Sequence, residues 1–96
     1  MGYGYSKRKK DDNHDEILKV FTDAMYYTLE TYMMNCGFDF LAWNSRNIFV
    51  VEVKDGNKPA SQTKLTKEEI EASKKYGDYY RVIYSTNQAR IIIQNQ

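Results

Sequence analysis

The sequence predicts an α/β domain in which a mixed sheet is flanked by helices, with its elements in the order α-β-β-β-α-β-β. Two stretches carry apolar residues at helical spacing, and five others are short, β-branched or apolar runs. The second helical stretch lies between two of these runs, as in a strand–helix–strand unit, and a hairpin precedes it. The chain has 96 residues, enough for one domain, which we expect over residues 12–96 after a flexible basic arm at 1–11.

The first half of the chain is expected to form one helix and three strands. A helix over residues 13–27 follows from apolar residues that recur every three or four positions, after polar first-turn residues. Turn-forming residues then separate three runs, which we expect to be the strands Thr28–Met33, Phe38–Trp43 and Ile48–Lys54. The third run is almost continuously apolar, which favours a central strand buried on both faces.

The second half begins with a loop over residues 55–65, which contains Pro59. A helix from Thr66 to Tyr76 is well specified, because Thr66 and Glu69 have the spacing of a capping box. Two further strands are expected at Tyr79–Tyr84 and Ala89–Gln94, joined by a turn.

Net charge and cysteine content restrict the protein class. The formal net charge of +1 is the sum of +4 in residues 1–10 and −3 in residues 11–96, which hold 10 basic and 13 acidic side chains. One cysteine excludes an internal disulfide, and one cysteine with one histidine excludes a four-ligand Cys/His zinc site. No apolar run approaches the roughly 18 residues of a membrane span, so we expect a cytoplasmic protein with no membrane partner.

The predicted hairpin between the second and third strands places two acidic residues together. A two- or four-residue connection gives a register in which paired residue numbers sum to 91, so Asp39 lies opposite Glu52. Opposed Cβ atoms are about 5 Å apart, where two carboxylates repel unless a cation lies between them. Lys54 projects from the same face as Glu52. This combination indicates a divalent metal site with a lysine beside it.

An alternative is that Glu52 and Lys54 are exposed residues of an edge strand and that Asp39 belongs to a turn. A three-residue hairpin loop would shift the register by one and separate the two carboxylates.

The motifs Gly37-Phe38-Asp39 and Glu52-Val53-Lys54 resemble those of the PD-(D/E)xK nuclease superfamily. Together with Asp12–Ile17, the segment up to Pro59 and Leu65-Thr66, they resemble the small VRR-NUC domains of phages. The resemblance implies a restriction-endonuclease-like fold and a Mg²⁺- or Mn²⁺-dependent DNA endonuclease. It also implies a homodimer that acts on branched DNA, as a Holliday-junction resolvase does.

The resemblance assigns roles to individual residues. Asp39, Glu52 and the Val53 carbonyl would bind the metal, and Lys54 would be the catalytic lysine. Glu16 would be the upstream acidic residue, which reaches the metal through water or binds a second one. The family's usual proline is replaced by Phe38, and its usual glutamine in the second helix by Glu69, which we expect to act mainly as a cap.

Other polar residues are weaker candidates. The side chains expected to contact DNA phosphates are Lys7, Arg8, Lys9, Lys10, Arg46, Lys58 and Lys64. His14, the only histidine, is expected to be exposed in the first helical turn. The nine tyrosines and the Met–Tyr clusters favour a homodimer.

The sequence therefore predicts a Mg²⁺- or Mn²⁺-dependent DNA endonuclease. Two alternatives stay open: a non-catalytic DNA-binding or interaction module with this fold, and a flap or nicking nuclease used in phage DNA processing.

Overall fold

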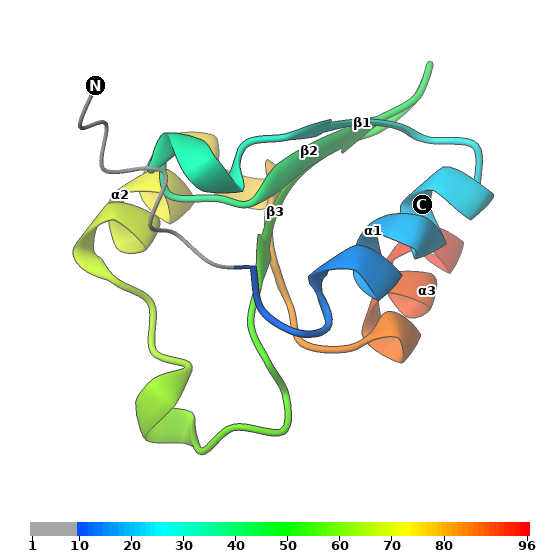
Figure 1. Cartoon of the computed structure of the whole chain (residues 1–96). Coiled ribbons are helices and arrows are strands. Elements are labelled where there is room, and N and C mark those ends of the chain that lie inside the picture. The colour runs from blue at the N-terminus through cyan, green and yellow to red at the C-terminus, as the bar shows by residue number, and fades with distance from the viewer. Residues whose placement is uncertain (1–9) are drawn as a thin grey trace.

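The computed structural model describes residues 10–96 and contains a four-stranded mixed sheet between two layers of helices (Figure 1). The strands lie in the order β1-β2-β3-β4; β1, β2 and β3 pair antiparallel, and β4 pairs parallel to β3. The helices and strands are α1 (His14–Asp23), β1 (Tyr27–Glu30), β2 (Phe40–Trp43), β3 (Ile48–Val53), α2 (Lys67–Tyr76), β4 (Tyr80–Ile83) and α3 (Thr86–Gln94). Short 3₁₀ turns are η2 (Tyr32–Met34), η3 (Ala60–Gln62) and η4 (Gly77–Tyr79).

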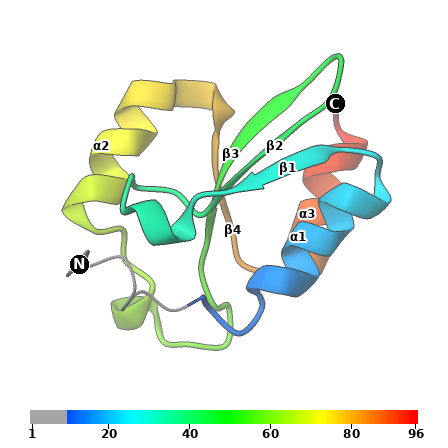
Figure 2. The same ribbon diagram turned by 45° about the horizontal axis from the view of Figure 1, so that its top comes forward.

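Figure 2 shows α1 and α3 on one face of the sheet and α2 on the other. Phe21 of α1 and Ala89 of α3 pack with Phe40, Val51 and other residues of the first face. Ala72 of α2 packs with residues such as Phe38, Val50 and Tyr80 on the second face. The central strand β3 is buried from its second residue onward, as its continuous apolarity predicts.

The predicted hairpin register is confirmed. Phe40 pairs with Val51 and Trp43 with Ile48, so paired numbers sum to 91. The Asp39 N–H donates to the Val51 carbonyl at 2.7 Å, which continues the pairing one residue beyond β2. Asp39 and Glu52 are therefore neighbours across the hairpin.

The predicted C-terminal strand is wrong, because residues 86–94 form helix α3. Ser85 caps this helix by accepting a hydrogen bond from the Gln88 N–H at 3.1 Å. Ala89, Ile92 and Ile93 then face the core at positions i, i+3 and i+4, while Ile91 is exposed. The run of three isoleucines has strand propensity, but burial against α1 decides the structure.

The first helix is shorter than predicted. It ends at Asp23, because Met25 adopts a left-handed conformation with φ of 69° and the chain turns back into β1. The predicted strand Thr28–Met33 is also shorter, since β1 ends at Glu30 and the 3₁₀ turn η2 follows. Within residues 10–96, no helix has both the length and the apolar character that crossing a membrane requires.

We predict that Gly37→Ala destabilises the domain far more than Gly77→Ala. Both glycines have positive φ, which costs an alanine about 1–2 kcal/mol. A Cβ at Gly37 would also lie 2.6 Å from the Glu68 carbonyl oxygen, whereas a Cβ at Gly77 meets nothing within 4 Å. We expect Gly37→Ala to lower the free energy of unfolding by about 2–4 kcal/mol in urea titrations. Equal losses for the two variants would contradict the close packing of Gly37 against α2.

Candidate functional site

Asp39 lies in the bend before β2, where two backbone hydrogen bonds and one side-chain hydrogen bond hold it. Its N–H donates to Val51, and its carbonyl accepts from the Thr31 N–H at 2.8 Å. Its Oδ2 accepts from the Val53 N–H at 2.7 Å. Asp39 is buried, and burial raises the pKa of its carboxyl, although the bond from Val53 opposes that shift. The carboxylate is therefore fixed at the end of β3.

Glu52 projects from β3 toward the α2 side of the sheet and is 3% exposed. Its Oε1 is buried and has no hydrogen-bond partner within the described residues. Burial, followed by the charges of Asp39 and Glu69, raises the pKa of Glu52 to about 10. A carboxyl group in this position needs a proton or a cation.

Lys54 follows β3 and lies between two carboxylates. Its Nζ is 2.8 Å from Glu69 Oε1 and 3.6 Å from Glu52 Oε2. Burial by itself would lower the pKa of Lys54, but the hydrogen bond to Glu69 and the charge of Glu52 outweigh it and raise that pKa. Lys54 is therefore a protonated ammonium held beside the acidic pair.

Glu69 performs two tasks in the second helix. Its Oε1 accepts from the Thr66 N–H at 2.9 Å, while its own N–H donates to Thr66 Oγ1, so the predicted capping box is confirmed. The same oxygen binds Lys54. Burial would raise the pKa of Glu69, but the bonds from Lys54 and Thr66 lower it. The cap of α2 therefore fixes the lysine, a second role that the sequence did not reveal.

The N-terminal segment contributes residues that sequence reasoning did not place in the site. Asn13 Nδ2 donates to the carbonyls of Lys54 and Tyr84, at 3.1 and 3.0 Å, and thereby ties α1 to the ends of β3 and β4. The charge of Asp11 acts on both Asp39 and Lys54, and raises the pKa of each. The sequence contains no signal for the position of Asp11.

Glu16 is exposed on α1 and lines a polar hollow with Asn13, Asp55, Tyr84 and Thr86. Its role toward the metal, which the resemblance implies, stays a prediction. Asp11, which precedes α1, adds a negative charge that acts weakly on Asp39.

The predicted phosphate contacts are only partly brought together. Lys58 lies 3.6 Å from Asp11, and Lys64 is exposed in the loop before α2. Arg46 lies in the β2–β3 turn, at the opposite end of the hairpin from Asp39. Lys10 forms an ion pair with Asp15 at 3.0 Å, whereas Lys7, Arg8 and Lys9, for which phosphate contacts are also predicted, lie outside the described residues.

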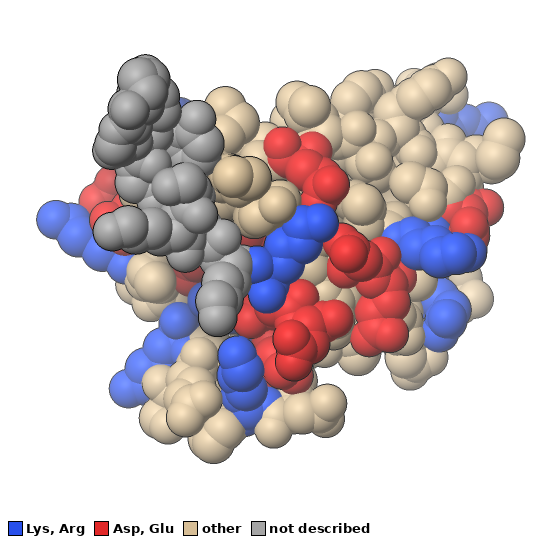
Figure 3. All heavy atoms as spheres, in the orientation of Figure 1, with Lys and Arg blue, Asp and Glu red and all other residues tan. Residues whose placement is uncertain are grey.

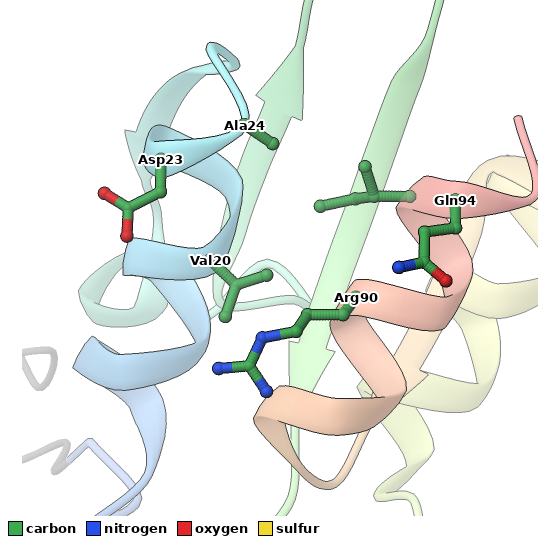
Figure 4. A pocket seen from close by; sticks show the side chains of 6 residues that line it. Val20, Asp23, Ala24, Arg90 and Gln94 are labelled. Carbon is green, nitrogen blue, oxygen red and sulfur yellow. The ribbon is translucent and has the colours of Figure 1, made fainter.

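The surroundings of the site are strongly charged. Figure 3 shows acidic and basic side chains alternating across the middle of one face of the molecule. A different hollow, between α1 and α3, is lined by Val20, Asp23, Arg90 and Gln94, and contains none of the acidic pair (Figure 4). The acidic pair therefore lies outside this hollow.

Asp39 and Glu52 fit an oxygen-ligand cation such as Mg²⁺ or Mn²⁺. Mg²⁺ is commonly held by one or two carboxylates together with several waters. Glu52 Oε1 is an unpaired acceptor, and Asp39 keeps a second oxygen beyond the one that Val53 binds. The Val53 carbonyl, at the end of β3, stays a predicted third ligand.

A family model described as "Protein NO VEIN, C-terminal" matches residues 15–93. The chain belongs to this family. No curated protein and no solved structure matches the chain. Membership of the NO VEIN C-terminal family overturns the assignment to VRR-NUC domains, and the phage and Holliday-junction descriptions that depended on that assignment fall with it. The resemblance was misleading because an aspartate, a Glu-x-Lys pair and a few turn residues are too few to separate families.

We predict that Glu52 makes the metal-free protein less stable as pH rises. The folded protein keeps a proton on Glu52 up to its pKa of about 10, whereas the unfolded chain releases it near 4.5. Between these values the unfolded state binds fewer protons than the folded state. The contribution of Glu52 to the free energy of unfolding is therefore fully present below pH 4.5 and is lost as pH increases.

The test is chemical unfolding in EDTA from pH 5 to pH 9. Glu52→Gln cannot titrate, so it should lack this loss and exceed the wild type at pH 8 by about 1–3 kcal/mol. Glu68→Gln, at an exposed neighbouring acid, should follow the wild type. The same pH slope in wild type and Glu52→Gln would contradict the buried, protonated state.

Proposed function

We propose that this domain hydrolyses phosphodiester bonds of DNA with a divalent metal ion, Mg²⁺ or Mn²⁺. The observation that carries the proposal is the unpaired, buried Oε1 of Glu52 beside the fixed carboxylate of Asp39. Without a cation, Glu52 can stay buried beside Asp39 and Glu69 only by keeping a proton, which it shares with these carboxylates in hydrogen bonds. A divalent cation would take the place of that proton.

The residues of the chain would divide the chemistry among them. Asp39 and Glu52 would hold the ion, which supplies a Lewis acid and a water of lowered pKa. Lys54 would place its ammonium where negative charge develops on the phosphate. Glu69 would keep that ammonium in position, because its Oε1 is 2.8 Å away and is itself fixed by Thr66.

The arrangement of elements is also consistent with a restriction-endonuclease-like fold, which we propose for this domain. The order is α-β-β-β-α-β, with the acidic pair on a hairpin and a helix crossing between parallel strands. Helix α3 lies where the apolar run at residues 89–94 predicted a fifth strand.

DNA is the proposed substrate because a phosphodiester matches both a metal-held carboxylate pair and a lysine. Lys58, 3.6 Å from Asp11, and the exposed Lys64 of the loop before α2 would contact flanking phosphates. A homodimer is also proposed. Exposed apolar side chains at one side of the sheet, including Tyr27 and Leu29 of the edge strand β1, support it.

We predict that purified protein cleaves DNA with Mg²⁺ or Mn²⁺ and not with EDTA. Asp39→Asn and Lys54→Met should lower the rate at least about 100-fold, because each removes a group that acts on the reacting phosphate. Glu68→Gln, which changes an exposed acid near the site, should keep the wild-type rate.

The assay should compare a linear duplex, a flap and a four-way junction. No cleavage of any substrate, with binding retained, would contradict the enzymatic function and favour a non-catalytic DNA-binding module. Wild-type rates for Asp39→Asn or Lys54→Met would contradict the site.

We also predict that Glu69→Gln lowers the cleavage rate about 10- to 100-fold without weakening α2. Glutamine can replace glutamate in a capping box, so the helix is kept, but it cannot neutralise the Lys54 ammonium. Circular dichroism and urea unfolding would verify the fold. A variant with an unchanged rate would show that Glu69 serves only as a cap.

A further inference from the structure

A second group of potential metal ligands lies at the start of α1 and the end of β1. Ligand atoms of His14, Asp15 and Glu30 all lie within 4.8 Å of one another. Among residues 10–96, these are the His, Cys, Asp or Glu side chains that form a group of three close enough to share one ion. None of its members belongs to the Asp39–Glu52 pair.

His14 is the unusual member, because it is buried, with 1% of its surface exposed. The sequence-based prediction of an exposed histidine is therefore wrong. Its ring packs edge-on against Tyr32 and Phe40, with centroids 5.3 and 5.7 Å away. Nε2 points at Glu30 Oε1, 2.8 Å away, whereas Nδ1 is buried without a partner within the described residues. The printed polar contact of the ring therefore lies inside the cluster, and Nε2 is the nitrogen that would bind an ion there.

The cluster already holds a cation, the ammonium of Lys10. Lys10 Nζ lies 3.0 Å from Asp15 Oδ1 and 3.6 Å from Glu30 Oε1, and 5.0 Å from the centre of the Tyr32 ring. This ammonium reaches both carboxylates from a side chain that is 32% exposed. It can therefore leave without disturbing the core.

We propose that His14, Asp15 and Glu30 form a second divalent-cation site, which Lys10 fills when no metal is bound. One imidazole nitrogen and two carboxylates, with positions left for water, suit Zn²⁺ or a similar transition metal. Mg²⁺ prefers the oxygen-only environment of Asp39 and Glu52. A metal in the second site and the Lys10 ammonium exclude each other, so loading the site releases Lys10. The proposal does not depend on the proposed nuclease function.

The test is a Zn²⁺ titration followed by NMR of the imidazole of His14, in excess Mg²⁺ and in a Cys36→Ser background. His14 is the only histidine, so its ring signals need no assignment, and Cys36 is removed because an exposed thiol also binds zinc. We expect a saturable change of the ring signals. Glu30→Gln and Asp15→Asn should weaken binding at least about tenfold.

The most specific comparison in this experiment uses a Lys10 variant. Lys10→Met should tighten Zn²⁺ binding about two- to fivefold, because it removes the competing ammonium. Lys19→Met is the matched control: Lys19 forms an exposed ion pair with Asp23 further along α1, so its loss should leave the affinity unchanged. All these substitutions are at exposed or half-exposed side chains, and thermal unfolding would verify that each variant is folded.

Three results would each overturn the proposal: no saturable change at His14, wild-type affinity in Glu30→Gln, or no difference between Lys10→Met and Lys19→Met. The His14 ring signal could also respond to Zn²⁺ in Glu30→Gln and fail to respond in Asp39→Asn. That result would place the ion at Asp39 and Glu52, and it would overturn the proposal as well.

Discussion

The hydrogen bond from the Val53 N–H to Asp39 Oδ2, 2.7 Å long, carries the β2–β3 pairing past the end of the ladder. A backbone donor in the central strand fixes the carboxylate, so Asp39 cannot rotate away from Glu52. Burial of β3 on both faces prevents the strand from shifting, because a shift of one residue would turn Glu52 into the α1 core. The fold therefore enforces the approach of two carboxylates that would otherwise separate.

This constraint concentrates negative charge at the site, and the nearby lysine neutralises it only in part. Lys54 is shared between Glu69 and Glu52, and lies closer to Glu69. The nearby charge of Asp11 adds to the negative potential. Within the described part of the chain, Glu52 Oε1 has no partner. A divalent cation would satisfy this oxygen and leave Lys54 with Glu69, and the two roles would not compete.

The central hairpin was predictable because its evidence is local. Turn residues limit the loop, continuous apolarity identifies a buried strand, and the period of two then places Asp39 and Glu52 together. The capping box of α2 was predictable for the same reason. Contacts between distant elements were not, and so the bond between Glu69 and Lys54, the role of Asp11 and the burial of His14 came only with the structure.

Helix α3 shows how propensity misleads. Three successive isoleucines favour a strand, but Ser85 and Gln88 have the spacing of a helix cap, which competed with that signal. The apolar face that α3 buries against α1 exists only when both helices lie on the same side of the sheet.

The most direct measurement is anomalous diffraction from crystals soaked in Mn²⁺. The account predicts a strong anomalous peak between the carboxylates of Asp39 and Glu52, with Lys54 still bound to Glu69. A saturated crystal with no peak at this position, and with the Glu52 side chain unchanged, would contradict the assignment of the carboxylate pair as a metal site.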